Sequence, residues 1–290
     1  MSDRRRVAAR LALAAVLSTL GGAALATLSV EAASATLAPA APTPSASDIV
    51  SRNIAARGGS EAWKRTLTMA WSGHVESTGP RDLRTPFVLE QVRPDRTRFE
   101  VASQGQTAVR VFDGSSGWKL IPSATGKPDV QAYSEDELRF ARHAQVIDGP
   151  LMDYVARHAA IDLVGMGDVQ GKPAYVLEIK LPDGSDSRIW VDAATFLESR
   201  HDRRVRNKAG QLGLVTVYFG DYRGFEGLQL PTTIETRSST GQVVNRLVIE
   251  KVAINPTLDM HMFAKPAVPG SRHRGVLVDT RSAGRPSPPQ

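Results

Sequence analysis

Residues 214–237 read LVTVYFGDYRGFEGLQLPTTIETR, and this stretch decides the fold class. Apolar runs occupy 214–222 and 230–237, and the segment between them contains Gly224 and Gly227. Short apolar runs with a period of two are typical of β-strands, and glycines between such runs are typical of a tight turn. The stretch therefore predicts two antiparallel strands joined by a short turn.

Strands of the same kind fill the middle of the chain. We expect them at residues 68–75, 87–92, 96–103, 107–113, 118–121, 161–169, 174–181, 188–192, 196–205, 214–222, 230–237 and 243–254. Short turns such as Asp183-Gly184 and Thr240-Gly241 separate consecutive strands. Tight turns predict an antiparallel meander, because parallel pairing needs long crossover connections.

Several of these strands are apolar on both faces. Leu214 and Tyr218 lie on one face of their strand, and Val215, Val217 and Phe219 lie on the other. A sheet with one face in water would alternate more cleanly between apolar and polar residues. We therefore predict a mainly β (α+β) fold with a strongly curved antiparallel sheet, or incomplete β-barrel, of about eleven strands with short lid helices. Such an interior can hold a ligand.

Three short helices are expected beside the strands. Ser45 and Asp48 have the spacing of a capping box, and so do Ser134 and Glu137. Pro150 begins the third segment, in which Leu151, Tyr154, Val155 and His158 follow a helical spacing of i, i+3, i+4 and i+7.

The first 35 residues have the layout of a secretory signal peptide. Residues 4–10 are basic, residues 11–30 carry no charge, and small residues offer cleavage after Ala26 or Ala35. The alternative is an uncleaved inner-membrane anchor, because about 20 uncharged residues can span a bilayer. The glycines and alanines of the stretch favour export with cleavage and a periplasmic location.

The remaining segments divide by composition. Residues 36–47 are rich in Ala, Pro, Ser and Thr and predict a flexible linker. Residues 48–266 have the length of one domain. Residues 267–290 carry four arginines and several prolines, which predicts a disordered basic tail. The tail arginines either contact anionic surfaces or are simply solvated, and we favour solvation.

The charge of the chain lies mostly at its ends. The formal net charge is +6 and the isoelectric point is about 9.8, but residues 1–35 carry +2 and residues 267–290 carry +3. The middle is therefore almost neutral, which argues against nucleic acid as a partner. The chain has no cysteine, which excludes disulfides, thiolate chemistry and a lipidated N-terminal cysteine.

No catalytic or cofactor motif is present. Gly114-Ser115-Ser116-Gly117 is one residue short of a nucleophile elbow, and Gly165-Met166-Gly167 lacks the third glycine of a dinucleotide fingerprint. None of the six histidines has metal-ligand spacing. We expect no enzyme activity, no cofactor and no metal.

A basic cluster, Arg203, Arg204 and Arg206, lies at the end of a predicted strand. One interpretation is a docking patch for an acidic partner or anionic lipids. The other, which we favour, is a charged edge that prevents sheet-to-sheet aggregation.

The chain resembles the LolA/LolB-like superfamily of outer-membrane lipoprotein-sorting proteins (lipoprotein localization factors) over most of residues 48–266. The resemblance lies in strand ends and turns rather than in catalytic residues. Its motifs are Ala55-Ala56-Arg57-Gly58-Gly59 before Trp63, a strand containing Gly73, Ile189-Trp190-Val191-Asp192, Tyr222 with Gly224, Leu230 and Pro231, then Ile254-Asn255 and Phe263-Ala264-Lys265-Pro266.

The resemblance implies a half-open barrel over an apolar cavity, with short helices as a lid. It implies a soluble periplasmic carrier or binding protein that sequesters acyl chains of lipids or lipoproteins for transfer toward the outer membrane. We expect a monomer whose partners are acyl chains and inner- or outer-membrane transfer proteins. The alternative is a periplasmic sensor or interaction protein that uses the same fold to bind a protein partner.

We predict a cavity wall and a lid within this domain. The predicted wall residues are Met69, Trp71, Phe87, Leu89, Leu177, Ile179, Trp190 and Tyr218. The predicted lid residues are Leu151, Tyr154 and Val155. The sequence does not fix which face of each strand points inward, and an ordinary dry core is the alternative for each residue.

Overall fold

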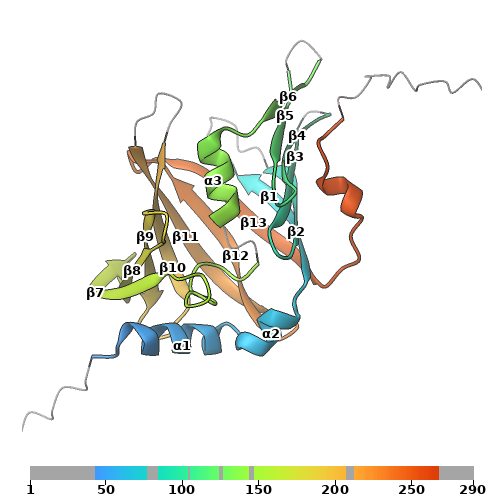
Figure 1. Cartoon of the computed structure of the whole chain (residues 1–290). Helices are drawn as coiled ribbons and strands as arrows, with labels where there is room; N and C mark the ends of the chain where they lie inside the picture. The colour runs from blue at the N-terminus through green and yellow to red at the C-terminus, as the bar shows by residue number, and fades with distance from the viewer. Residues whose placement is uncertain are drawn as a thin grey trace, which may run out of the picture. The chain divides into compact units, whose positions relative to one another are not determined.

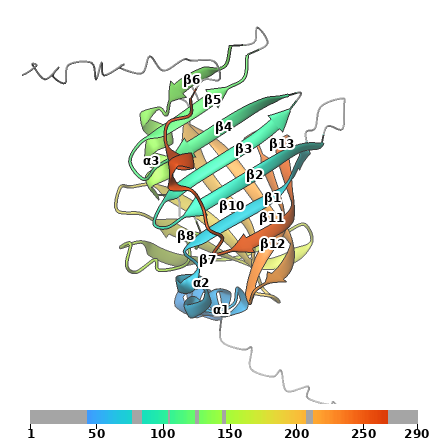
Figure 2. The same ribbon diagram turned by 90° about the vertical axis from the view of Figure 1, so that its right-hand side faces the viewer.

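The structure is a computed structural model that describes residues 43–76, 84–103, 105–123, 127–143, 147–206 and 212–267. Within these residues, thirteen antiparallel strands form one curved sheet that does not close into a barrel (Figures 1 and 2). The predicted mainly β fold is confirmed, with more strands than expected because residues 129–132 also form one. The predicted signal peptide and nearly all of the predicted tail lie outside the described residues.

The strands are β1 (Thr68–Glu76), β2 (Arg84–Val92), β3 (Arg96–Ser103), β4 (Gln106–Phe112), β5 (Gly117–Ile121), β6 (Asp129–Ala132), β7 (Ala160–Val169), β8 (Lys172–Lys180), β9 (Asp186–Asp192), β10 (Glu198–Arg206), β11 (Leu212–Phe225), β12 (Leu228–Arg237) and β13 (Val243–Ile254). The helices are α1 (Ala46–Ala56), α2 (Ser60–Arg65), α3 (Glu135–His143) and the short 3₁₀ helix η1 (Met260–Phe263).

The order of strands in the sheet explains where α3 lies. The order is β6-β5-β4-β3-β2-β1-β13-β12-β11-β10-β9-β8-β7, so β6 and β7 follow each other in the chain but form opposite edges. The chain that connects them, which includes α3, must therefore cross from one edge to the other. Figure 1 shows α3 between the two arms of the sheet.

Register defines two faces of the sheet, because directly paired residues project to the same side. Trp71 of β1 pairs with Leu89 of β2 and Val252 of β13, and Leu89 pairs with Phe99 of β3. We call the face that carries these side chains the inner face. On the other arm, the inner face carries Leu177, which pairs with Ile189.

The helix α1 covers the inner face of β7–β9. The predicted capping box is present, since Ser45 Oγ accepts from the backbone N–H of Asp48 and the Asp48 carboxylate accepts from the Ser45 N–H. The helix thus begins at Ala46, inside the predicted linker. Its buried side chains pack on the sheet in a cluster of Ile49, Val50, Leu151, Ala159, Leu177, Ile179, Ile189 and Val191.

A second cluster fills the inner face where α2 meets the centre of the sheet. Its buried residues are Trp63, Met69, Ile147, Met152, Leu228 and Leu230. The helix α2 was not predicted from the sequence, although it carries Trp63 of the family resemblance. Trp63 is fully buried, and its indole N–H donates to the carbonyl oxygen of Arg57 at 3.0 Å.

A third cluster lies on the outer face. Phe263 of η1 is buried against Val109, Val111 and Leu120 of β4 and β5. Figure 2 shows η1 in front of these strands. The Phe263 motif of the resemblance therefore covers the outside of one arm.

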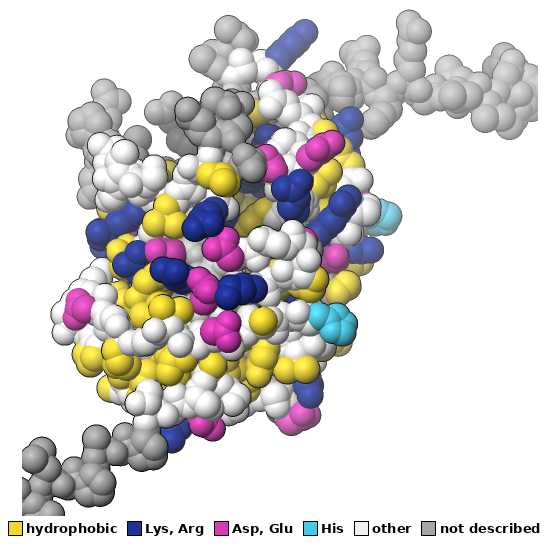
Figure 3. All heavy atoms as spheres, turned by 60° about the vertical axis from the view of Figure 1, so that its left-hand side comes forward, with side chains coloured by type: hydrophobic (Ala, Val, Ile, Leu, Met, Phe, Trp, Pro, Cys, Tyr) yellow, Lys and Arg dark blue, Asp and Glu magenta, His cyan; other side chains and the backbone are white. Residues whose placement is uncertain are grey.

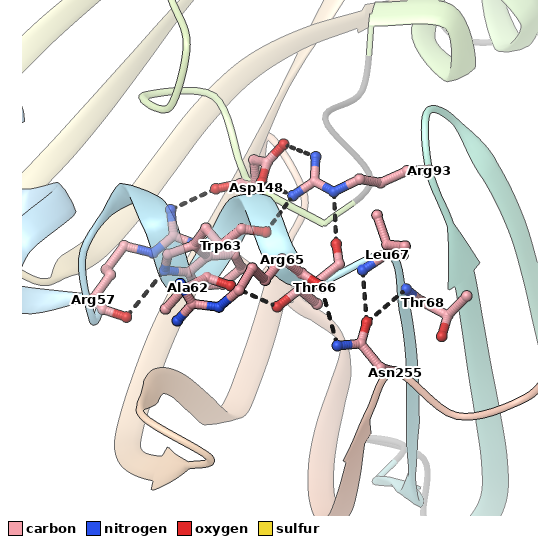
Figure 4. Close-up of polar contacts among 10 residues, drawn as sticks. All are labelled: Arg57, Ala62, Trp63, Arg65, Thr66, Leu67, Thr68, Arg93, Asp148 and Asn255. Carbon is pink, nitrogen blue, oxygen red and sulfur yellow. Dashed lines mark hydrogen bonds and ion pairs between the residues drawn. The ribbon is translucent and has the colours of Figure 1, made fainter.

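Polar contacts hold the segments around α2 in place (Figure 4). Asn255 accepts from the Leu67 N–H at 2.7 Å and donates to the Arg65 carbonyl at 3.1 Å. Asp148 is buried and pairs with Arg93, whose guanidinium also donates to Trp63 O and Thr66 O. The start of the 147–159 segment is thereby fixed to β2 and α2.

The 147–159 segment corrects one prediction. We expected a helix from Pro150, but residues 150–158 form turns. Asp153 and His158 have φ values of 53° and 55°, which interrupt helical geometry. The apolar spacing instead places Leu151 in the first cluster and Met152 in the second.

Candidate functional site

The centre of the inner face carries apolar side chains that no helix buries completely. We call this set the central strip: Trp71, Leu89, Phe99, Val217, Phe219, Ile234 and Leu247. Each is half-buried, and all but Trp71 lie outside the core clusters and their packed neighbours. The strip runs across β3, β2, β1, β13, β12 and β11, so it forms one surface rather than scattered exposed residues.

The helix α3 lies across the open side of this surface and contacts both arms. On one arm, Glu137 accepts from Lys119 Nζ at 2.8 Å and from Arg110 Nη2 at 2.9 Å. On the other arm, the guanidinium of Arg203 lies 4.1 Å from the centre of the Phe140 ring. This contact joins α3 to β10, so α3 is a candidate lid over the surface.

The charge of Glu137 is strongly favoured in this position. Burial alone would raise the pKa of Glu137, but hydrogen bonds from Lys119, from the Ser134 N–H and from Arg110 together lower it to about 2. The Ser134 contact is the predicted capping box of α3, in which the Glu137 N–H donates to Ser134 Oγ at 3.3 Å. One carboxylate therefore both begins the helix and attaches it to β4 and β5.

Some buried polar atoms of the inner face have no hydrogen-bond partner among the described residues, and two of them lie in or beside the central strip. They are Nε1 of Trp71 and Nε2 of His201. Buried polar groups nearly always form hydrogen bonds, so an unpaired atom of this kind needs an explanation. Burial, with a smaller contribution from Arg203, lowers the pKa of His201 to about 4, so its ring is neutral at physiological pH.

The predicted wall residues divide into three groups. Trp71 and Leu89 belong to the central strip. Met69, Phe87, Leu177 and Ile179 lie on the same face but are fully or almost fully buried. Leu177 and Ile179 in particular are covered by α1 and Leu151.

Trp190 and Tyr218 lie on the outer face, so they do not share a surface with the other six residues. Both pair directly with Arg200 across β9–β10 and β10–β11. The Arg200 guanidinium stacks on them at 4.2 Å and 5.8 Å from the ring centres. Trp190 and Tyr218 therefore contact Arg200 on the outer face and do not line the site.

The predicted lid residues lie near the base of the sheet, away from the lid position of α3. Leu151 is fully buried and Tyr154 is partly buried against the first cluster, whereas Val155 is 68% exposed. The sequence did identify α3 as a helix, but it did not assign Phe140 or Glu137 to the lid. The acidic first turn opposite basic strand residues was the signal for that contact.

The basic cluster does not form one patch in the described residues. Arg203 projects to the inner face, whereas Arg204 lies on the outer face, where it pairs with Asp186 at 3.4 Å. Figure 3 shows basic and acidic side chains interleaved on the surface of this arm. The side chain of Arg206 lies outside the described residues.

Two hollows open where β12 separates from β13, which pair only from Thr233 and Val248 onward. One hollow, of about 570 Å³, is mostly apolar and includes Trp71 and Val252. The other, of about 510 Å³, is lined by charged residues that include Asp221 and Arg246. Trp71 therefore lies where the central strip meets the split in the sheet.

Other kinds of site find no support in the described part of the chain. No group of three or more His, Asp or Glu side chains there has an arrangement suited to a metal ion. None of the described helices is both long enough and apolar enough to cross a membrane. What remains is an apolar surface with a few polar groups at its margin.

The described residues thus form an open, curved antiparallel sheet with helices across its inner face (Figure 1). No family model matches the chain, and no curated protein matches its sequence. Solved structures are similar to it, and they include a DUF1329 family protein from Desulfovibrio piger. That likeness has a TM-score of 0.50 and 14% identity, and it covers 77% of this chain and 98% of the other.

Two further solved structures have the same low identity. A LolA superfamily protein from Nitrosomonas europaea has a TM-score of 0.49, 14% identity and coverage of 77% and 99%. An outer membrane lipoprotein-sorting protein domain from Vibrio parahaemolyticus has a TM-score of 0.47, 14% identity and coverage of 75% and 95%. The likeness to the DUF1329 family protein concerns the fold alone, because the identity is only 14%.

Proposed function

We propose that this protein is an exported, periplasmic carrier or binding protein that holds the acyl chains of lipids or lipoproteins against the central strip. The observation that carries the proposal is the continuous, half-buried apolar surface across six adjacent strands. Leaving such a surface in water is unfavourable, and an acyl chain is a ligand that needs no specific polar partners.

The expected energetics are sufficient for stable binding. Burying an acyl chain contributes up to about 0.8 kcal/mol per methylene, from which ordering costs must be subtracted. A chain of sixteen carbons would thus bind strongly with only part of its length buried. Release then requires movement of α3, which is attached to β10 by the contact between Arg203 and Phe140.

The direct test is mass spectrometry of organic extracts from the purified protein, combined with titration of a fluorescent fatty acid. Near-stoichiometric lipid and saturable binding support the proposal. An empty protein that also ignores the fatty acid contradicts it.

A matched pair of variants locates the binding surface. Leu89 lies on the inner face and its neighbour Val88 lies on the outer face, where it is 38% exposed. Leu89→Arg should abolish fatty-acid uptake in a folded protein, because a charge would lie on the central strip. Val88→Arg should bind like the wild type, and equal loss in both variants would contradict the assignment.

A second candidate function is recognition of a protein partner. The edge strand β7 has ten residues and exposes Val164 and Met166, at 53% and 56%. A free strand edge can pair with an extended peptide. Binding of a protein by a preparation that holds no lipid, lost when Val164→Lys is introduced, would favour this alternative.

A further inference from the structure

The strand β10 differs from its neighbours on the inner face. At the inward positions beside the middle of β10, the neighbouring strands carry Ile189 and Ser187 of β9 and Val217 and Val215 of β11, none of which is charged. Between them, β10 places His201 and Arg203. A strand that only completed an apolar wall would carry apolar residues there.

Arg203 also differs from most arginines of the sheet. Carboxylate partners are found for seven of them: Arg98, Arg110, Arg188, Arg200, Arg204, Arg237 and Arg246. No carboxylate of the described residues forms an ion pair with Arg203, whose guanidinium instead lies on the Phe140 ring. Burial lowers the pKa of Arg203, which reflects the cost of holding its charge away from water.

The carboxylate of Glu137 on α3 is already paired, so it is not a partner for Arg203. Arg110 and Lys119 are the basic residues of the opposite arm that face α3, and both already share Glu137. Arg203 is therefore a cation on the inner face that has no carboxylate partner among the described residues, and it lies on the same strand as His201, whose Nε2 is unpaired.

We propose that Arg203, assisted by His201, binds the anionic oxygen atoms of a lipid head group whose acyl chain lies on the central strip. This inference rests on the proposed function and adds the class of ligand, an amphiphile with a carboxylate or phosphate group. Arginine offers several N–H donors in a planar arrangement that matches either group. Phe140 covers one face of the guanidinium and leaves its edge for the ligand.

The test compares amphiphiles with the same sixteen-carbon chain and different head groups. Hexadecanoate, hexadecyl phosphate and neutral hexadecanol are titrated against the full chain, with inorganic phosphate as a competitor. The wild type should bind at least one of the two anions about tenfold to a hundredfold more tightly than hexadecanol, as expected for a charge-assisted hydrogen bond. Inorganic phosphate at millimolar concentration should not displace them.

Variants of neighbouring arginines assign the effect to one residue. Arg203→Gln should lose the preference for the anion and keep the affinity for hexadecanol, and Arg203→Lys should restore part of the preference. Arg204→Gln is the matched control, because Arg204 is the next residue but lies on the outer face. It should behave like the wild type, and circular dichroism checks that each variant is folded.

The outcomes separate this inference from the proposed function. If the wild type binds all three amphiphiles equally, the proposed function stands and the head-group site is overturned. Equal weakening of anion and alcohol by Arg203→Gln, or displacement by inorganic phosphate, also overturns it. If the wild type binds none of the three, the proposed function fails, and the head-group site fails with it.

Discussion

Gly58 lies at the end of α1, where the backbone approaches the turn between β11 and β12. An added Cβ on Gly58 would lie 2.2 Å from the carbonyl oxygen of Gly227. The φ of Gly58 is 111°, a conformation that strongly favours glycine. Two glycines that the sequence shows only as turn residues are therefore also a contact between distant parts of the chain.

Substitution at Gly58 should reveal this contact. Gly58→Ala is expected to cost about 3 kcal/mol or more, because backbone strain is joined by a clash with a carbonyl oxygen that cannot move freely. The control is Gly59→Ala, which has a φ of 85° but no atom within 4 Å of the added Cβ, and should cost about 1–2 kcal/mol. Urea unfolding measures both, and equal losses would contradict the proposed contact.

At the scale of elements, local chemistry predicted some helices and missed others. Both capping boxes are present, because a capping box is formed by residues three positions apart. The spacing after Pro150 has no such local determinant, and there the buried positions of Leu151 and Met152 reflect contacts with two different clusters. A helical spacing of apolar residues therefore predicted a helix less reliably than a capping box did.

The attachment of α3 should depend on pH. The pKa of Glu137 is lowered from 4.5 to about 2, so its stabilising contribution is complete above pH 4.5 and is lost as the pH falls toward 2. Glu137→Gln should therefore lower the free energy of unfolding by at most about 3 kcal/mol at neutral pH. The difference from the wild type should shrink steadily below pH 4.5.

Glu135→Gln provides the control for this effect, since Glu135 lies in the same first turn. Thermal unfolding between pH 2 and pH 7 gives the comparison. A pH-independent difference between Glu137→Gln and the wild type would show that the carboxylate does not carry the attachment.

At the scale of the whole molecule, the sequence predicted the class of sheet but not its inner surface. Strands with apolar residues on both faces do not reveal which face is inside. The register of the strands shows which face is inside, and it places Trp190 and Tyr218 on the outer face with Arg200. The central strip and the pairing of Arg203 with Phe140 join residues far apart in sequence, so no local pattern could predict them.

Shortening a side chain should lower the stability by different amounts at two positions of the inner face. Leu177→Ala should cost about 2–5 kcal/mol, because Leu177 is fully buried beneath α1 and the variant leaves a cavity. Leu89→Ala should cost less than about 1.5 kcal/mol, because Leu89 is only half-buried. Chemical denaturation tests this, and similar losses at the two positions would mean that the central strip is packed as tightly as the core.

The pairing of β1 with β13 has a consequence for folding during synthesis. Met69 of β1 pairs with Ile254 of β13, so the first strand of the sheet pairs with the last. All other pairs of neighbouring strands in the sheet are consecutive in sequence. During synthesis, β1–β6 can form a meander whose β1 edge has no partner until β13 leaves the ribosome. Closing so long a loop is slow, and an open strand edge invites aggregation. We therefore expect C-terminal truncations before Val243 to accumulate as aggregates instead of as a folded half, which expression and sedimentation of such fragments would measure.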